Sequence, residues 1–293
     1  MKRLIAMMAV LATLATACAE SGAQPLGPAP SADGPSPSPG SPSPTLSPTS
    51  PEPPTPAQSM TYELWFNYDG SLFVTHRTEP FTPSVGTRAL EALLEGPSAP
   101  ERAANLGTTI NAGTRLNGLT IDDGVATVDL DATFVGEETP AIAVGSLAQI
   151  VFTLTQFDRI GGVVFEVDGG PLTNFGGYEI DGAQRRTNFA DQLPAILVQS
   201  PGIGERVSSA VLISGTANVF EAVVSIAILD QNGKVIASTF TMATCGTGCR
   251  GTWETDVAYE VAATQPGTVR VYEVSAMDGS KINVVNIPVT LTV

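Results

Sequence analysis

The side chains best suited to covalent or metal chemistry are few: three cysteines and one histidine in 293 residues. Cys245 and Cys249 stand four positions apart, and the glycines between them allow the tight bend that a short loop needs. In an exported protein, where disulfides persist, this spacing favours a local disulfide of modest stabilising effect. A zinc half-site is the alternative, but it lacks partners, because His76 is the only histidine and no further free cysteine is expected.

His76 would have to serve any mechanism that pairs a serine or cysteine nucleophile with a histidine base. It stands in the segment Val74-Thr-His-Arg-Thr78, which has the pattern of an exposed strand end. We therefore expect a solvated surface histidine, and we predict that the protein is not an enzyme.

The densest group of carboxylates is Asp129, Asp131, Glu137 and Glu138. Asp129-Leu-Asp131 begins like a calcium loop, but Phe134 stands at the sixth position, where that loop needs glycine. Asp129 and Asp131 are expected on one strand face, so a weak cation site or a glycosidase carboxylate pair is an alternative. One strand face rarely supplies two carboxylates that flank a cleft. A polar solvent face is the preferred interpretation, with no metal and no cofactor.

Two further patterns bear on ligand binding. Gly161-Gly162 and Gly169-Gly170 are not phosphate loops, because neither GxxxxGK[ST] nor GxGxxG before a helix occurs. Five aromatic residues could present their faces to sugars, although core packing explains most of them better: Tyr62, Trp65, Phe66, Trp253 and Tyr259.

The remaining cysteine, Cys18, follows an export signal. Met1-Lys-Arg3 is positively charged, and the uncharged stretch from Leu4 to Ala17 is shorter than the roughly 20 residues of a membrane span. Leu14-Ala-Thr-Ala-Cys18 resembles the bacterial lipobox, which implies a signal peptide of residues 1–17 and a lipid-modified Cys18. Ordinary cleavage with a free Cys18 is the alternative. Acyl chains on Cys18 would anchor the chain to the cell membrane, with everything after it extracytoplasmic.

Composition limits the remaining possibilities. The formal net charge of −15 argues against nucleic acid, whose phosphates require a basic surface, and against adsorption on anionic lipid. Residues 18–59 hold 13 of the 23 prolines and no aromatic residue, so we expect a disordered tether. In an extended proline-rich conformation this tether would reach on the order of 100 Å.

Residues 60–175 show the periodicities of an α+β domain. The expected order is β(β)αββαβ, with helices on one sheet face. The expected elements are strands over 62–68 and 72–75 around an Asp69-Gly70 turn, a helix over 84–95, strands over 111–121 and 125–130, a helix from Thr139-Pro140 to about Phe157, and a strand over 163–167.

Four segments of this domain resemble the GerMN domain of sporulation and spore-germination proteins. They begin at Ala89-Leu-Glu-Ala-Leu-Leu-Glu-Gly-Pro97, continue through Asn117–Leu130 and Gly145–Leu154, and end at Val163-Val-Phe-Glu-Val-Asp-Gly169. The resemblance covers about residues 60–172. It implies a role in assembly or interaction at the cell envelope, and the ring-building relatives make self-association possible.

After an interdomain linker at 176–194, residues 195–293 contain many short strands separated by turn signals such as Asn232-Gly233 and Asp278-Gly279. This spacing predicts an immunoglobulin-like β-sandwich. Ser200-Pro201, Ser214–Ala222 and Asp230-Gln-Asn-Gly233 resemble the Gmad2 domain, which often follows GerMN.

Together these features predict a lipid-anchored envelope protein that binds rather than catalyses. The expected partner is an envelope protein or peptidoglycan. The alternatives are a wall-glycan binding protein or an accessory lipoprotein of a sensor kinase, and a wall hydrolase is disfavoured.

Overall fold

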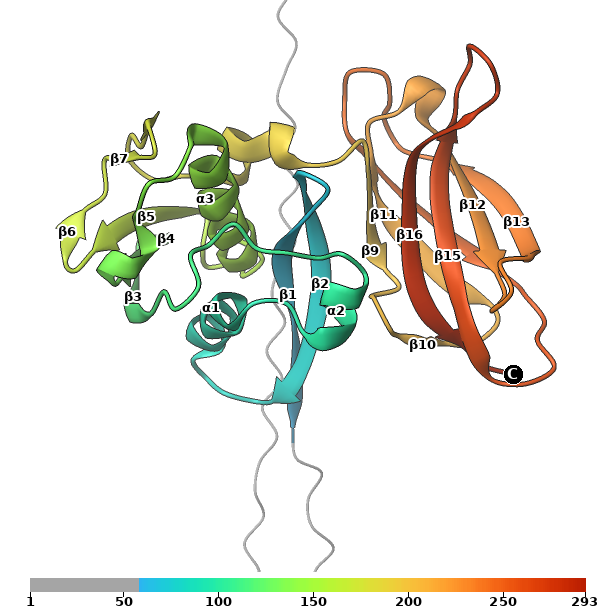
Figure 1. Cartoon of the computed structure of the whole chain (residues 1–293), viewed down its shortest axis with the longest axis horizontal. Helices are drawn as coiled ribbons and strands as arrows, with labels where there is room; N and C mark the ends of the chain where they lie inside the picture. Colours follow the sequence, from blue (N-terminus) through green and yellow to red (C-terminus); the bar gives the residue numbers. More distant parts are fainter. Residues whose placement is uncertain (1–57) are drawn as a thin grey trace, which may run out of the picture. The chain divides into compact units, whose positions relative to one another are not determined.

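A computed structural model describes residues 58–293 of the chain (Figure 1). The predicted signal peptide, the predicted lipidation site Cys18 and nearly all of the predicted tether lie outside the described residues. Within the described range, no helix is long and apolar enough to cross a membrane.

The described residues begin with a hairpin of two ten-residue strands, β1 (Ser59–Tyr68) and β2 (Ser71–Pro80). Its turn is Asp69-Gly70, and both residues have positive φ (49° and 80°), as a two-residue hairpin turn of type I′ requires. Leu64, Trp65 and Phe66 are consecutive and all buried, so β1 packs apolar side chains on both of its faces. The hairpin is therefore an internal element of the domain.

The second sheet of this domain has the strand order β3-β4-β5-β6. These strands are β3 (Leu116–Asp122), β4 (Val125–Leu130), β5 (Gly162–Val167) and β6 (Gly170–Pro171). Strands β4 and β5 pair in parallel, and the connection between them contains the 3-10 turn η1 (Ala132–Phe134) and the helix α3 (Pro140–Leu154). Ala126, Val128 and Leu130 are fully buried along one face of β4, as its alternation predicts.

The helix α3 is the centre of this domain. Thr139 caps its N-terminus through a hydrogen bond from the Ile142 amide, and Pro140 is the first helical residue. Nearly all residues from Ala143 to Leu154 are buried, because α3 contacts the hairpin and β5 as well as the helix α1 (Val85–Glu95). A short helix, α2 (Ala99–Ala103), follows α1.

The α+β class is confirmed, but three details of the prediction were wrong. The hairpin forms its own sheet instead of extending the sheet of β3 to β6, and α3 contacts both. The strand expected over 111–121 begins at Leu116, and the helix expected to reach about Phe157 ends at Leu154. Short helix α2 was not predicted.

Residues 174–192 connect the two domains and contain β7 (Asn174–Phe175), β8 (Tyr178–Glu179) and the 3-10 segment η2 (Arg186–Gln192). Phe189 is almost fully buried, and Gln184 exchanges two backbone hydrogen bonds with Val163 of β5. This connection is thus packed against the first domain.

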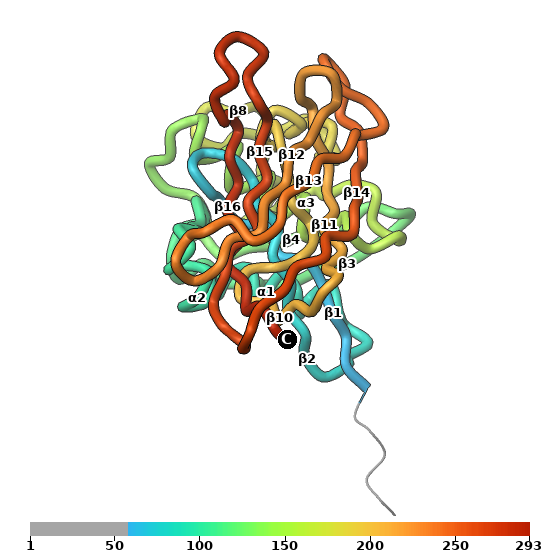
Figure 2. Tube along the Cα trace, turned by 90° about the vertical axis from the view of Figure 1, so that its right-hand side faces the viewer, coloured from blue at the N-terminus to red at the C-terminus, as the bar shows by residue number. Residues whose placement is uncertain are grey.

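The C-terminal region is a sandwich of two antiparallel-rich sheets, in the orders β10-β16-β15-β12-β13 and β14-β11-β9. The predicted immunoglobulin-like fold is confirmed, and Figure 2 shows the β15–β16 hairpin projecting at one end. Its strands are β9 (Ile196–Ser200), β10 (Arg206–Val207), β11 (Val211–Ala217), β12 (Val223–Leu229), β13 (Val235–Met242), β14 (Gly251–Val257), β15 (Gln265–Val274) and β16 (Lys281–Leu291).

Candidate functional site

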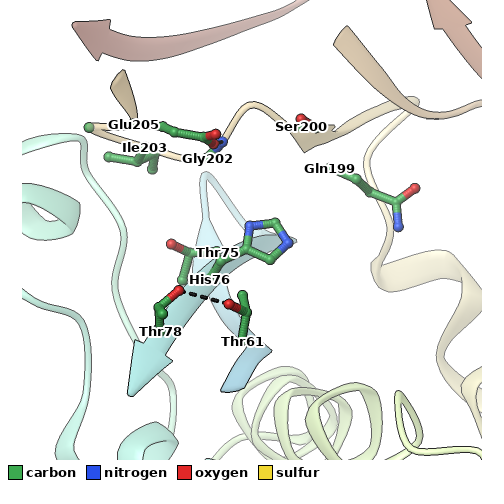
Figure 3. Close-up of a pocket in the computed structure, with 10 residues that line it drawn as sticks. Thr61, Thr75, His76, Thr78, Gln199, Ser200, Gly202, Ile203 and Glu205 are labelled. Carbon is green, nitrogen blue, oxygen red and sulfur yellow. Dashed lines mark hydrogen bonds between the residues drawn. The ribbon is translucent and has the colours of Figure 1, made fainter. Parts of the chain in front are cut away.

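A polar cleft of about 560 Å³ lies between the β1–β2 hairpin and the loop from β9 to β10 (Figure 3). The hairpin contributes hydroxyl groups and His76, the end of β9 contributes the Gln199 amide and the Ser200 hydroxyl, and the loop contributes the Glu205 carboxylate. Thr61 and Thr78 are hydrogen-bonded to each other across the hairpin, with their hydroxyl oxygens 2.8 Å apart. The lining residues are Thr61, Thr75, His76, Thr78, Gln199, Ser200, Gly202, Ile203, Gly204 and Glu205.

His76 is placed differently from the expectation of a solvated strand end. It lies in the middle of β2 and is half-buried, and Figure 3 shows its imidazole projecting from β2 into the cleft. A Cβ atom at Gly202 would lie 3.4 Å from its Nδ1, at ordinary van der Waals distance, so the loop backbone lies against the ring. The prediction was wrong because the second domain, which the hairpin sequence cannot reveal, covers this part of β2.

The cleft brings Ser200, His76 and Glu205 together, the residue types of a hydrolytic triad. The Ser200 hydroxyl donates to the Leu212 carbonyl oxygen at 3.4 Å, and Glu205 accepts a hydrogen bond from the Gly202 amide at 2.7 Å. Neither group therefore makes the contact with His76 that a nucleophile–base–acid chain requires. The arrangement suits hydrogen bonding to a polar ligand.

Glu101, which carries no prediction from sequence, is buried directly behind the cleft. Its carboxylate accepts hydrogen bonds from the Thr75 hydroxyl at 2.7 Å and from the Ser98 amide at 2.6 Å, and it forms a two-pronged ion pair with Arg77. Burial alone would raise the pKa of Glu101, but the hydrogen bonds from Arg77, Thr75 and Ser98 outweigh it and lower the pKa to about 2. The Ser98…Glu101 spacing is that of a capping box and was the signal available in the sequence.

A second network fixes α1 to the hairpin. Arg88 pairs with Glu79 at 2.8 Å and with Glu95 at 2.9 Å, and the Tyr62 hydroxyl donates to Glu79 at 2.9 Å. Burial, followed by the hydrogen bond to Glu79, raises the pKa of Tyr62 to about 12. The hydrogen bond from Arg88 lowers the pKa of Glu79. These charged groups hold α1 against the hairpin and do not line the cleft. Thr78, the neighbour of Glu79 on β2, does line it.

The carboxylates that are close together in the sequence, Asp129, Asp131 and Glu138, bind different donors in the structure. Asp129 accepts a hydrogen bond from the Gly169 amide, while Asp131 lies past the end of β4 and accepts one from the Arg115 amide. Glu138 accepts from Asn111 and from the Gly136 amide. The expected shared strand face for Asp129 and Asp131 was therefore wrong, and no cluster of potential metal ligands occurs within residues 58–293.

The five aromatic residues of the alternative sugar platform are all in the core, and each residue is 4% exposed or less. Trp65 packs on Phe152, with ring centroids 4.7 Å apart. These side chains stabilise the fold and do not form an exposed aromatic platform.

Cys245 and Cys249 are joined by a disulfide, with their Cα atoms 5.7 Å apart. The loop is tightly packed: a Cβ atom at Gly246 would collide with Ala222, and one at Gly251 would collide with the Cys245 backbone. Thr247, between the cysteines, has a positive φ of 53°. The Glu221 amide donates to the Thr247 hydroxyl at 3.1 Å, so the disulfide loop also braces the turn before β12.

The fold is an α+β domain followed by an immunoglobulin-like sandwich, and a packed segment joins the two. Polar residues of both domains line the cleft between them. Residues 65–173 match the family model described as "Sporulation and spore germination" (Germane), and residues 195–280 match Gmad2, the "Immunoglobulin-like domain of bacterial spore germination". The chain thus contains both domains, in that order.

Two solved structures from Bacillus subtilis are similar to parts of the chain. The first GerMN domain of the sporulation protein GerM is 26% identical, with a TM-score of 0.36, over 44% of this chain and 98% of that one. The tandem GerMN domains of GerM are 18% identical, with a TM-score of 0.37, over 80% of this chain and 61% of that one. No curated protein matches the chain significantly. The family matches carry the domain assignment.

Proposed function

We propose that this protein is a lipid-anchored, extracytoplasmic binding and assembly module of the cell envelope that works without catalysis. The observation that carries the proposal is the succession of a sporulation and germination domain and a germination-type immunoglobulin-like domain behind a lipobox-like segment ending at Cys18. The anchor would hold two folded domains outside the membrane, within reach of envelope proteins, peptidoglycan or a second copy of the chain.

The polar groups of the described residues support binding over chemistry. In the cleft, the Ser200 hydroxyl donates to a backbone carbonyl oxygen, and the Glu205 carboxylate accepts from a backbone amide. Neither group is hydrogen-bonded to His76. Asp129 and Asp131 are likewise held by backbone amides. Groups already engaged in this way can position a polar ligand, but they are poorly arranged to transfer protons to and from it.

The anchor is tested by the variant Cys18→Ala in the full chain. Acylation on the cysteine should place the wild-type protein in the membrane fraction and in the detergent phase of a two-phase extraction. The variant should appear in the aqueous phase or the culture medium. A variant that stays with the membrane to the same extent as wild type would contradict lipid anchoring.

The binding role is tested by crosslinking in intact cells, followed by identification of the captured molecule. A specific envelope protein, peptidoglycan fragment or second copy of the chain is expected, and its capture should be lost when Cys18→Ala releases the protein. Incubation of the purified full chain with cell wall is the companion measurement. Cleavage of wall glycan that Asp129→Ala abolishes would overturn the non-enzymatic role.

A further inference from the structure

A smaller hollow of about 300 Å³ lies where residues 186–193, which join the two domains, meet β9 and β11. Most of its lining is apolar and comes from both domains, including Trp65, Phe152, Leu193 and Leu197. Two arginines, Arg186 and Arg250, line the same space. Both arginines are partly exposed, the Arg186 side chain by 38%, so a ligand that enters the hollow can reach their guanidinium groups.

Arg186 is held rigidly but only partly neutralised. Its Nε donates to the Thr155 hydroxyl and its Nη2 to the Phe152 carbonyl oxygen, both at 2.9 Å. The guanidinium lies 5.3 Å from the Trp65 ring centroid, and the nearest Glu63 carboxylate oxygen is 3.9 Å from Nη2. Burial lowers the pKa of Arg186, and Glu63 only partly opposes this shift. Three of its five N–H donors have no protein acceptor among the described residues.

Arg250 lacks even a partial counter-charge. Its Nη1 donates to the Thr216 hydroxyl at 3.1 Å and its Nη2 donates to the Pro194 carbonyl oxygen. Within residues 58–293, no carboxylate forms an ion pair with Arg250, and burial lowers its pKa. As in Arg186, two donors are used and three remain. The bonds to Thr216 and Pro194 fix its guanidinium at the edge of the hollow.

We propose that this hollow binds a monocarboxylate carried on a compact apolar body, with Arg186 and Arg250 donating to the carboxylate oxygens. The inference rests on the proposed binding role and names a ligand class for it. Arginine forks fit carboxylates geometrically, and charge-assisted hydrogen bonds of this kind are the strong ones. Leu193 and Leu197 would contact the apolar part of the ligand.

The balance of charge selects a monoanion over a phosphate dianion. Glu63 offsets part of the charge of Arg186, so the hollow holds between one and two net positive charges in a chain whose formal net charge is −15. A monoanion fits within this charge, whereas a dianion would leave up to one negative charge uncompensated next to Glu63. The volume is at the lower end of the range for ligand pockets, which limits the ligand to a small acid or to the carboxylate end of a peptide.

The test is calorimetric titration of the detergent-solubilised full chain with N-acetyl-L-leucine and with its neutral amide, N-acetyl-L-leucinamide. The acid should bind at least about tenfold more tightly than the amide, and Arg250→Gln should weaken acid binding about tenfold. Arg185→Gln is the matched control: Arg185 precedes Arg186, is exposed and donates to the Gly161 carbonyl oxygen away from the hollow. That variant should bind within about twofold of wild type.

Ala190→Phe keeps the test decisive if Arg250→Gln does not fold. Ala190 is exposed at the edge of the hollow, so a phenyl group there should block it while both arginines remain. Equal affinity for the acid and the amide, or unchanged acid binding in folded Arg250→Gln or Ala190→Phe, would overturn the proposal. So would the absence of binding by wild type at acid concentrations on the order of 10 mM.

A hexapeptide ending in leucine distinguishes the source of the carboxylate. Binding as tight as that of N-acetyl-L-leucine supports the proposal with a peptide end as ligand, and weaker binding supports it with a small free acid. Membrane anchoring is measured separately with Cys18→Ala. Loss of the ligand site would therefore leave the anchor result standing, and failure of the anchor would leave the ligand result standing.

Discussion

The two domains treat charge in different ways. In the N-terminal domain, Glu101 and Glu79 are neutralised by Arg77 and Arg88, and these ion pairs join α2 and α1 to the hairpin. All ion pairs found within residues 58–293 involve this domain. In the sandwich, Arg270 donates to Asn286, and Arg250 donates to a hydroxyl and a carbonyl oxygen.

The apolar surface differs as well. Edge strand β13 of the sandwich carries Phe240 and Met242, whose side chains are 67% and 63% exposed. The N-terminal domain buries its largest aromatic residues around α3. The first domain uses its charges internally to fix its geometry, whereas the sandwich relies on strand pairing and a disulfide. The sandwich exposes Phe240 and Met242, and its Arg250 has no carboxylate partner among residues 58–293.

The variant Glu101→Gln tests the ion pairs inside the N-terminal domain. Glu101→Gln should lower the free energy of unfolding by about 3 kcal/mol at pH 7, because it leaves Arg77 without its partner. The folded pKa of about 2 lies below the ordinary value of 4.5. The stabilisation is therefore present above about pH 4.5 and is lost as the pH falls towards 2, so the difference between variant and wild type should narrow over that range.

Denaturant titrations at several pH values measure this effect. Glu91→Gln is the control, because Glu91 is half-exposed and its ion pair with Arg88 is long, at 3.8 Å. This variant should change the free energy of unfolding by less than about 1 kcal/mol. A loss for Glu101→Gln that is as small as that of Glu91→Gln would show that internal ion pairs do not distinguish the two domains.

The next effect tests strand packing in the sandwich. A Cβ atom at Gly215 of β11 would collide with the Leu197 carbonyl oxygen of β9, so Gly215→Ala should destabilise the protein by about 2–3 kcal/mol. Gly118→Ala in β3 meets nothing within 4 Å and should change the free energy of unfolding by less than about 0.5 kcal/mol. Similar melting temperatures for the two variants would contradict the close approach of β9 and β11.

A slightly smaller effect tests the covalent link. The double variant Cys245→Ser/Cys249→Ser should lose about 2 kcal/mol, because a disulfide that closes so short a loop restricts the unfolded chain only modestly. Treating wild type with a reductant should give the same loss. If reductant changes nothing and both thiols react with an alkylating reagent beforehand, the cysteines are not paired in the protein.

The smallest effect concerns the apolar edge. Phe240→Lys should change the free energy of unfolding by less than about 0.5 kcal/mol, because the side chain contributes little to the core. Phe165→Ala, in the buried face of β5, should cost about 3–5 kcal/mol. Equal losses in thermal unfolding would mean that β13 is covered in solution by another part of the protein or by a second copy.

Local patterns predicted most of the fold. The Asp69-Gly70 and Asp123-Gly124 turns, the alternation from Val125 to Leu130 and the Thr139-Pro140 helix start all appear in the structure, because each depends on neighbouring residues. Strands β9 (Ile196–Ser200) and β14 (Gly251–Val257) were not predicted individually, because β9 has only five residues and β14 has only two apolar residues, Trp253 and Val257. Both strands depend on β11, with which they pair.

The candidate sites were harder to predict. Glu101 had a local signal in the Ser98 capping box, but its ion pair with Arg77 joins residues 24 positions apart. Arg186 and Arg250 stand in segments without any motif, and they line one hollow only because the connecting segment packs against α3 and the sandwich at once.

The succession of two domain types, the buried face of strands such as Val125–Leu130 and the cysteine spacing compatible with a local disulfide are properties of the sequence alone. These properties follow from residue type and short-range periodicity. Tertiary structure alone decided that His76 is half-covered, that the carboxylates of Asp129 and Asp131 are used separately, and that two arginines share an apolar hollow. Burial and charge pairing depend on segments distant along the chain, and only folding brings those segments together.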